Sequence, residues 1–405
     1  MGIADLCATL VRIKSENPPG DTRDVIEYIR DFCSGIGLGM KVVKRRGGRH
    51  NLVSAKPRGK LLFCGHVDCV PALPDGWSDD PYGGTIRDGK VFGRGTTDMK
   101  GGCAAVLWAC REWMESGRDL PADLAFVCDE ETSGTYGIRT LLARRAIIPC
   151  DCIIAEPTPP FSPNVGQKGI MRLCCTFRGE PGHGSLYPEK GVSAIMEAYR
   201  LLDFVKDLHG VSFNPGDPGL SGLIRDSAAI LGDLLDIPNA YDILTRVMYN
   251  PGTIQGGEKA NIVAQQCRLE LDLRIPWGCN LESLLCDLKR HAPRGDIAVT
   301  NMAEPSLTPP DAPLVSTLLQ EIEKVYKRPA RPVVQWAASD ARYLRKEGFS
   351  VVEYGPGEIR TLHAIDEYVT IESLVNASRV YRGMLAHYAG AKKRVSSLSL
   401  GRSVS

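Results

Sequence analysis

Acidic and histidine residues follow three short apolar segments of this chain and one glycine-rich turn. KLLFC (60–64) precedes His66 and Asp68, LAFVC (124–128) precedes Asp129, Glu130 and Glu131, CIIA (152–155) precedes Glu156, and GRGTT (93–97) leads into Asp98. Short segments that are apolar on both faces are typical of central strands in a covered parallel sheet. Because ligands bind beyond the carboxyl ends of such strands, we expect these polar side chains to meet at one sheet edge.

This set of side chains has the chemistry of a metal site. Carboxylates from distant parts of the chain would repel one another strongly at one sheet edge unless a cation neutralised them. Carboxylate oxygens combined with at least one imidazole suit Zn²⁺, Co²⁺ or Mn²⁺. The sequence therefore predicts divalent metal binding at the expected edge.

The spacing within two motifs indicates separate roles for neighbouring residues. His66 and Asp68 are two apart, so both point to one side of an extended chain, which suits a ligand histidine and a carboxylate that fixes its tautomer. Glu130 and Glu131 in an extended segment point opposite ways, so one can bind metal while the other acts as a general base. Each motif alone has a simpler alternative: a polar loop end, a solvated acidic turn or, for Asp98, a helix cap.

The first 160 residues alternate short apolar runs with helical patterns, which predicts an α/β fold with a mixed, mainly parallel sheet. Helices are expected at 21–36, 101–115 and 136–145. The segment 157–169 is rich in Pro and Gly and therefore marks a boundary. Beyond this boundary, strands are expected at 170–177, 250–254 and 264–275, and helices at 191–208 and 281–291.

The first pattern resumes from residue 292, with a helix at 313–326, a strand at 350–354 and a helix at 371–387. We therefore predict one α/β domain, 1–169 and 292–390, interrupted by a smaller α+β domain, 170–291. The segment 210–242 has Pro and Gly around one helical pattern and is predicted only as an insertion. The tail 391–405, rich in Ser, Arg and Lys, is expected to be disordered.

Composition narrows the class of protein. The chain has 405 residues, and its 49 basic residues nearly balance its 48 acidic ones, which argues against nucleic-acid and polybasic membrane partners. The longest apolar stretch, 101–110, is about half of what a bilayer span needs, and the N-terminus has neither signal-peptide nor transit-peptide character. The 14 cysteines lie scattered in apolar runs, as expected of reduced thiols. We therefore expect a cytoplasmic enzyme.

Five ordered motifs carry a family resemblance: GHVDCVP, GRGTTDMKGG, DEETSG, AEPT and EYGPGEIRTLHAIDEYV. Together they resemble the dinuclear zinc amidohydrolase and exopeptidase family, which includes acetylornithine deacetylase, succinyl-diaminopimelate desuccinylase, aminoacylase and the glutamate-releasing carboxypeptidases. The resemblance runs from SENPPGDT near the N-terminus to the last predicted helix. It implies a zinc-exopeptidase-like catalytic domain that carries an inserted lid and dimerisation domain.

The resemblance also implies roles for matching positions. His66, Asp98 and Glu156 would hold one divalent ion, and Asp98, Glu131 and His363 a second one, with Zn²⁺ expected first and Co²⁺ or Mn²⁺ possible. Asp68 would orient His66, and Glu130 would be the general base. The implied reaction is hydrolysis of the amide bond of a small N-acyl amino acid, as in the deacylases of amino-acid biosynthesis.

Two segments of the expected lid carry further implied roles. In GHGS (182–185), His183 would reach the active site of a partner subunit, which implies a homodimer through the inserted domain; the alternative is an exposed loop histidine. In GTIQGGEKANIVAQQCRLELDLR, Asn261 and Arg274 match substrate-contacting positions. Arg274 suits a substrate carboxylate because guanidinium binds carboxylates in a bidentate fork, but an ion pair with Asp272 or Glu270 is the alternative.

The chain departs from the family pattern at places that bear on substrate. Ala264 stands where the family commonly has Pro, and Trp336-Ala337-Ala338 stands where a glycine-rich stretch is common, which should narrow that wall of the pocket. A di- or tripeptide exopeptidase acting at the same site is therefore kept as a second expectation. A non-catalytic protein that binds acyl amino acids is disfavoured, because every expected ligand and Glu130 are present.

Overall fold

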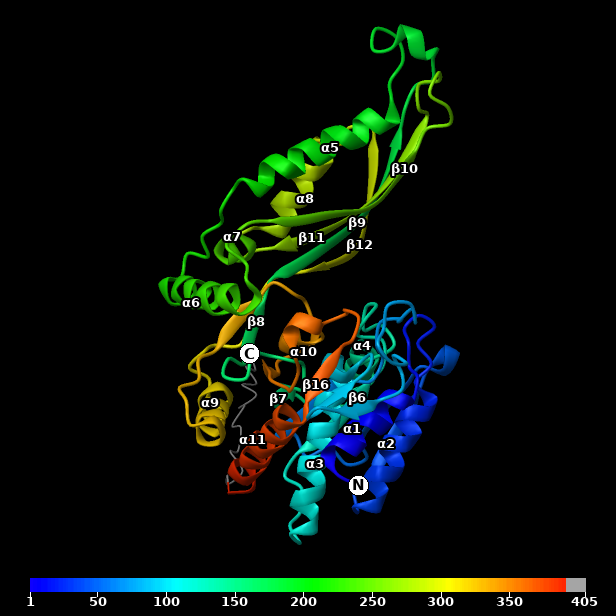
Figure 1. Ribbon diagram of the computed structural model, residues 1–405. Helices are drawn as coiled ribbons and strands as arrows, with labels where there is room; N and C mark the ends of the chain where they lie inside the picture. Colours follow the sequence, from blue (N-terminus) through cyan, green and yellow to red (C-terminus); the bar gives the residue numbers. More distant parts are fainter. Residues whose placement is uncertain (391–405) are drawn as a thin grey trace, which may run out of the picture.

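A computed structural model describes residues 1–390; the predicted disordered tail, 391–405, lies outside the described residues. Two units built on separate sheets make up the molecule, a larger one that contains both ends of the described chain and an elongated smaller one (Figure 1). Within residues 1–390, no helix combines the length and apolar character needed to cross a membrane.

The larger sheet has the strand order β1-β2-β6-β3-β7-β15-β8-β13, with β14 paired to β8. Its centre consists of four parallel strands, β6 (Asp123–Val127), β3 (Leu61–His66), β7 (Asp151–Ile154) and β15 (Ser350–Glu353). Every residue of β3 and β6 is buried, which explains why these strands are apolar on both faces. The predicted α/β fold with a mixed sheet is confirmed, and the parallel part forms the centre of that sheet. The remaining strands are β1 (Met40–Lys44), β2 (His50–Ser54), β8 (Asn164–Gln167), β13 (Ser306–Leu307) and β14 (Val333–Gln335).

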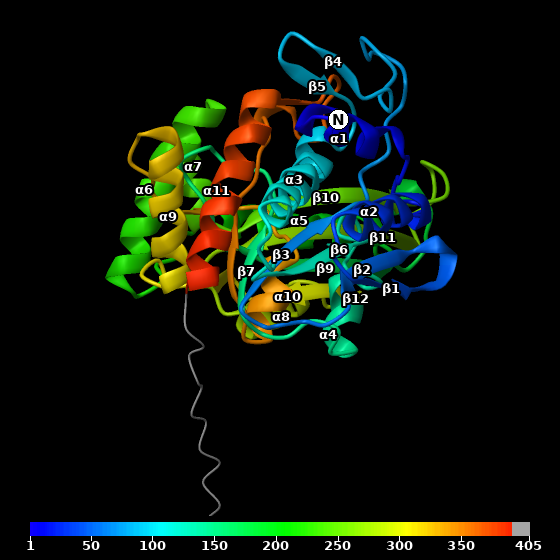
Figure 2. The same ribbon diagram turned by 90° about the horizontal axis from the view of Figure 1, so that it is seen from below.

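Helices cover both faces of this sheet (Figure 2). On one face lie α1 (Ile3–Arg12), α3 (Gly101–Glu115) and α11 (Ile371–Gly390), which contact one another. On the other face lie α4 (Ile138–Ala143) and α10 (Ala341–Lys346). Further helices are α2 (Arg23–Gly35) and α9 (Pro313–Tyr326), and a small sheet comprises β4 (Thr85–Arg87), β5 (Lys90–Phe92) and β16 (Tyr368–Thr370).

The smaller unit is a four-stranded antiparallel sheet with the order β10-β11-β9-β12. Its strands are β9 (Gly169–Arg178), β10 (Met248–Gly256), β11 (Gln266–Ile275) and β12 (Gly295–Ala303). Side chains alternate along β9 and β11, so one face packs beneath α5 (Ala194–His209) and α8 (Leu281–Arg290). The opposite face carries polar residues, including Arg172 and Arg274.

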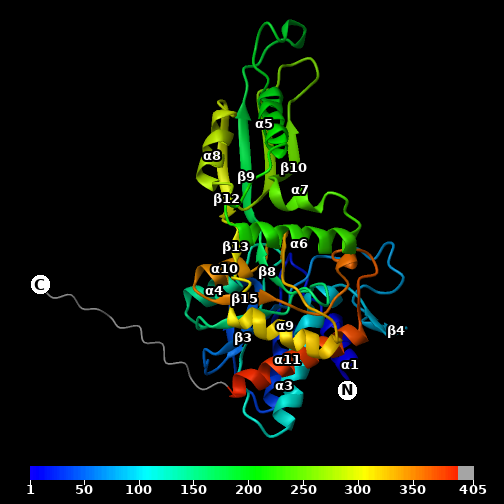
Figure 3. The ribbon, with the colours of Figure 1, turned by 90° about the vertical axis from the view of Figure 1, so that its left-hand side faces the viewer.

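The boundaries between the units differ from those expected. Strand β12 pairs with β9, so the second sheet extends to Ala303, beyond the expected end at residue 291. The expected insertion, 210–242, contains α6 (Pro218–Leu235) and the beginning of a second helix, α7 (Ala240–Thr245), which ends beyond it. Their buried residues, including Ile224 and Leu244, belong to the core of the larger unit. Helix α6 therefore lies across the junction between the two units (Figure 3).

Two short connections join the units. One residue, Lys168, separates β8 from β9, and two residues separate β12 from β13. The Lys168 ammonium donates hydrogen bonds of 2.6 Å to the carbonyl oxygens of Ile243 and Arg246. Helix α7 is therefore fixed directly to the junction.

Candidate active site

His66 ends the central strand β3 and faces two acidic side chains. Its Nε2 atom lies 2.9 Å from Oδ1 of Asp98 and 3.6 Å from Oε1 of Glu156. Glu156 follows β7, the parallel neighbour of β3, so the two carboxyl ends lie side by side. One potential ligand atom from each of the three residues lies within 4.8 Å of the others, close enough to hold one metal ion.

Asp98 also belongs to a second group of potential ligands. Its Oδ2 atom lies 3.2 Å from Nε2 of His363, and this nitrogen is 3.4 Å from Oε2 of Glu131. The potential ligand atoms of these three residues again lie within 4.8 Å of one another. Asp98 thus presents one oxygen to each histidine, which is the geometry expected of a carboxylate shared by two ions. The structure brings all five predicted ligands together.

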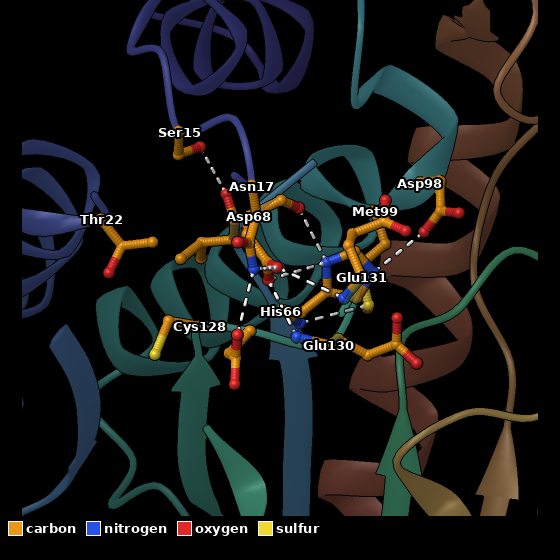
Figure 4. A network of polar contacts seen from close by, with 12 residues as sticks. Ser15, Asn17, Thr22, His66, Asp68, Asp98, Met99, Cys128, Glu130 and Glu131 are labelled. Carbon is orange, nitrogen blue, oxygen red and sulfur yellow. Dashed lines mark hydrogen bonds and ion pairs between the residues drawn. The ribbon is translucent and has the colours of Figure 1, made fainter. Parts of the chain in front are cut away.

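Asp68 supports this edge of the sheet from within. Nδ1 of His66 lies 2.8 Å from the main-chain oxygen of Asp68 and 3.5 Å from its Oδ1 atom. A proton on Nδ1 is therefore held by Asp68, so that in the neutral imidazole the lone pair of Nε2 would be free to bind a metal ion between Asp98 and Glu156. The backbone N–H groups of Glu130 and Glu131 also donate to the Asp68 carboxylate, each at 3.3 Å (Figure 4).

The Glu130–Glu131 segment is a turn, not the extended segment that was predicted. The prediction was wrong because the Asp68 carboxylate accepts both N–H groups, and because Asp129 before them has a positive φ of 75°. The two side chains nevertheless separate. Glu131 approaches His363, while Glu130 runs away from Asp68 (Figure 4) and lines the neighbouring cavity.

Asn17 ties the N-terminal loop to two strand ends. Its Nδ2 atom donates to Oδ2 of Asp68 at 2.9 Å and to Oδ1 of Asp129 at 3.2 Å. The side chain is buried, and the hydroxyl of nearby Ser15 donates to the main-chain oxygen of Val67 (Figure 4). One amide therefore holds two buried carboxylates that would otherwise repel each other.

Glu367 fixes the turn that carries Asp98. Its buried carboxylate accepts hydrogen bonds from the backbone N–H groups of Gly95, Thr97 and Asp98 at 2.8–3.1 Å. It also accepts a bond of 2.6 Å from the Arg94 guanidinium. Because Glu367 lies four residues after His363, it holds the segments of two potential ligands together.

Burial and crowding shift the pKa values in this cluster. Burial raises the pKa of Glu130, Glu131 and Glu156, and neighbouring carboxylates add to these shifts. Hydrogen bonds with Asp98 and Glu131 raise the pKa of His363 to about 10. Within residues 1–390, the only ion pairs of Asp98, Glu131 and Glu156 are with histidines. This donor set fits divalent cations, whose charge would stabilise the ionised carboxylates.

A cavity of about 630 Å³ opens beside the two ligand groups, between the larger and the smaller unit. Glu130 lines it together with Asp98, Glu131, Glu156 and His363. The segment from Trp336 to Ala338 forms part of its wall, at the place where the sequence predicts a narrowed pocket.

Two arginines of the smaller unit face the same cavity. Arg172 on β9 and Arg274 on β11 both line it, and Asp272 lies between them. The Asp272 carboxylate accepts bonds of 2.7 Å from Arg172 and 2.8 Å from Arg274. The ion pair weighed as an alternative for Arg274 is therefore present, yet the group keeps one net positive charge toward the cavity.

His183 and Asn261 lie elsewhere. The loop 179–193 forms the far end of the smaller unit, away from the larger sheet (Figure 1). His183 bridges to Ile262 there, and the main-chain oxygen of Asn261 accepts a bond from Gly184. Both side chains are exposed, and neither lines the active-site cavity of its own chain. The structure thus joins these two residues to each other but not to the five potential ligands.

Sequence reasoning missed Asn17, Arg172 and Glu367. Each acts through a contact with residues far along the chain, which no local pattern shows. A signal was nevertheless present for Asn17 and Glu367, since both lie inside the quoted motifs SENPPGDT and HAIDEYV. Arg172 alternates with buried residues along β9. The sequence therefore predicts that Arg172 lies on the polar face of this strand, but not that it lines the cavity.

Known proteins share both the sequence pattern and this fold. Residues 62–387 match peptidase family M20/M25/M40. The chain belongs to this family. It is 28% identical to a succinyl-diaminopimelate desuccinylase from Sulfurovum sp. (strain NBC37-1), covering 96% of this chain and 99% of the relative. It is 29% identical to an acetylornithine deacetylase from Vibrio vulnificus (strain CMCP6), covering 91% and 95%.

Solved structures of the M20 family agree with the fold. A metallo-carboxypeptidase of this family from Sulfolobus solfataricus superposes with a TM-score of 0.78 at 17% identity, covering 96% of this chain and 99% of that chain. The resemblance stated from the motifs is confirmed, as is the family fold. Membership of the M20 family makes this chain a hydrolase of the metal-dependent amidohydrolase class.

Proposed function

We propose that this chain hydrolyses the amide bond of small N-acyl amino acids with the help of two divalent metal ions. The observation that carries this proposal is the pair of ligand groups that share Asp98 beside a cavity lined by Glu130. Five ligands for two ions leave open positions for water and substrate, as catalysis requires. The names of the desuccinylase and deacetylase relatives support the class of substrate.

The metal ions would be held as the ligand groups indicate. His66, Asp98 and Glu156 would hold one ion, and Asp98, Glu131 and His363 the other, with Zn²⁺ favoured by the mixed imidazole and carboxylate set. Bound ions would lower the pKa of a water molecule and polarise the substrate carbonyl. Asp68 would keep His66 in the tautomer with its Nε2 lone pair toward the site.

Glu130 has the position required of a general base. It lines the cavity, forms no ion pair within residues 1–390, and has a pKa raised by burial. A raised pKa brings a carboxylate closer to the operating pH, where proton transfer is most efficient. Glu130 would take a proton from the attacking water and then deliver it to the nitrogen of the leaving amine.

Arg274 and Arg172 would receive the carboxylate of the amino acid. Arg172 bonds to Asp272 through Nε, and Arg274 bonds to it through Nε and, at 3.5 Å, through Nη2. The Nη groups of Arg172 and the Nη1 group of Arg274 would therefore be available to a ligand in the cavity. A guanidinium fork matches carboxylate geometry, and the net positive charge of the trio would attract one anionic group.

His183 and Asn261 would complete the active site of a second subunit. Their exposed positions at the far end of the smaller unit support a role outside their own chain. Large apolar side chains are exposed around them, namely Leu186, Tyr187, Ile195, Met196, Tyr199, Ile254 and Ile262. A surface of this kind is typical of a protein–protein contact, so we infer a homodimer through the smaller unit, which would act as the lid.

The direct test is release of a free amino acid from N-acetyl and N-succinyl amino acids by the purified, zinc-loaded chain. Glu130→Gln serves as the control, because it preserves size and removes the base. Hydrolysis by the wild type and not by Glu130→Gln would support the proposal. Hydrolysis of dipeptides or tripeptides alone would instead favour an exopeptidase, and no hydrolysis of either class would contradict both.

A further inference from the structure

Helices α6 and α7 are held by hydrogen bonds from three separate segments of the chain. The backbone N–H of Val334, two residues before Trp336, donates to the hydroxyl of Ser227 on α6 at 2.9 Å. Arg360, three residues before His363, donates to a carbonyl oxygen in the last turn of α6 at 2.8 Å. Lys168 at the junction binds the end of α7. These hydrogen bonds hold the segment that follows α6, and α7, beside the cavity.

This anchoring places two isoleucines in the cavity wall. Ile237 lies between α6 and α7, and Ile243 lies within α7. Both are half-buried, and both line the cavity that contains Glu130. The same cavity has four further large apolar lining residues, Ile170, Met248, Trp336 and Leu362.

The strand register sets Arg274 among these apolar side chains. On one side Arg274 pairs with Met248 of β10, and on the other side it pairs with Ile170 of β9. Ile243 precedes Met248 by five residues. An amino acid whose carboxylate binds Arg274 would therefore have apolar neighbours for its side chain.

The wall offers no partner for a cationic side chain. Among the described residues that line the cavity, the only carboxylates are Asp98, Glu130, Glu131 and Glu156, which belong to the ligand groups and the base. A substrate ammonium against Ile237 and Ile243 would lose its hydration without gaining an ion pair, which is costly. An apolar side chain would gain by leaving water.

We infer that the preferred substrates are N-acyl amino acids with an apolar side chain, which Ile237 and Ile243 select. This inference rests on the proposed hydrolysis of N-acyl amino acids and specifies its substrate class. It separates this chain from an enzyme for N-acetyl-ornithine or N-succinyl-diaminopimelate, whose amino-acid side chains carry charge.

The test compares kcat/KM for N-acetyl-leucine, N-acetyl-ornithine, N-succinyl-diaminopimelate and N-acetyl-glycine on the zinc-loaded full chain. We expect N-acetyl-leucine to exceed both charged substrates by about 10-fold or more. In Ile237→Asn/Ile243→Asn, the ratio of kcat/KM for N-acetyl-leucine to that for N-acetyl-glycine should fall by about 10-fold. The matched control is Tyr241→Asn, an exposed α7 residue outside the cavity, which should leave this ratio unchanged.

Both substrates are measured on one preparation, so the ratio does not depend on the folded fraction. A preference for either charged substrate, or an unchanged ratio in the double variant, would overturn the inference while leaving the amidohydrolase proposal intact. Failure to hydrolyse every N-acyl amino acid tested would overturn the proposed function itself. The wild-type preference needs no variant, so the inference stays testable even if the double variant does not fold.

Discussion

The metal-ligand edge of the larger sheet and the far end of the smaller unit hold their histidines in opposite ways. His66 is 1% exposed and contacts three acidic residues, Asp68, Asp98 and Glu156, which come from separate segments. His183 is exposed, and among residues 1–390 its ring bonds only to Ser185, two residues along the chain. One histidine is fixed by the whole domain, the other by its own loop.

This difference shows which chemistry can be complete within one chain. Preorganised ligands lower the reorganisation needed when a metal ion binds, so the candidate ligand edge could bind metal without a partner subunit. His183 and Asn261 at the far end could bind an oxyanion or a substrate, but the candidate metal ligands and Glu130 of the same chain lie in the larger unit. The two regions thus fit one active site only if a second chain brings them together.

Metal removal should have the largest effect. Prolonged chelation should abolish hydrolysis, and adding Zn²⁺ or Co²⁺ should restore it, because the buried carboxylates need a cation to act. Elemental analysis of metal-loaded protein should give two ions per chain. A value well below one tightly bound ion per chain would contradict the assignment of the ligand edge.

Substitutions at the adjacent glutamates should fail in different ways. Glu130→Ala should keep both metal ions but lose about 10²–10⁴ in kcat, the usual contribution of a general base. Glu131→Ala should lose metal at the site of His363, because Glu131 approaches that histidine. Metal content and kcat are measured on both variants to separate the two roles. Equal metal loss in both variants would show that the roles of Glu130 and Glu131 are misassigned.

His183→Ala should reduce kcat by about 10²–10³, the effect of removing one oxyanion donor. Mixing it with Glu130→Ala under conditions of subunit exchange should restore activity, since one site in each heterodimer has an intact Glu130 and a His183 from its partner. His387→Ala, an exposed histidine on α11, is the matched control and should retain full activity. Confirmed exchange without restored activity would show that His183 does not act between subunits.

Asn17→Ala should have the smallest effect of the four, a loss of about 10–100-fold in kcat, as is usual for residues that orient metal ligands. Without the Asn17 amide, the carboxylates of Asp68 and Asp129 lose a shared hydrogen-bond donor and repel each other. The turn that carries Glu130 should therefore shift, which lowers kcat, while KM should change little. The exposed Asn250→Ala is the control. If Asn17→Ala lowers both kcat and the unfolding temperature but leaves the metal affinity unchanged, Asn17 has only a structural role.

Part of the candidate ligand edge was predictable because His66, Glu131 and Glu156 follow short segments that are apolar on both faces. Asp98 follows a glycine-rich turn instead, and His363 was indicated only by the family resemblance. Strands that are apolar on both faces lie at the centre of an α/β sheet. Because these central strands are parallel, their carboxyl ends lie at the same edge of the sheet. Helices α3 and α9 have the predicted bounds, because the apolar periodicity of each helix is unbroken along its length. The predicted helix 21–36 becomes Arg23–Gly35, a shift of one or two residues at each end.

Other features depended on contacts between distant segments. Helix α1 has Leu6, Leu10 and Val11 at helical spacing, yet the N-terminus was considered only as a targeting segment. Strand β12 is mostly exposed, so its pattern does not show which sheet it joins. Periodicity shows that α6 has an apolar face but not which core receives that face, and this is why the insertion could not be placed.

The position of β15 in the larger sheet has a consequence for synthesis of the chain. This strand, residues 350–353, lies between β7 and β8, which are completed about 180 residues earlier. His363 and Glu367 follow it, so a chain still emerging from the ribosome has three of the five ligands on neighbouring strand ends but lacks the second histidine and the carboxylate that fixes the Asp98 turn. The two candidate ligand groups are therefore complete together only after residues 363–367 have joined the chain, so any metal bound earlier would occupy an unfinished site.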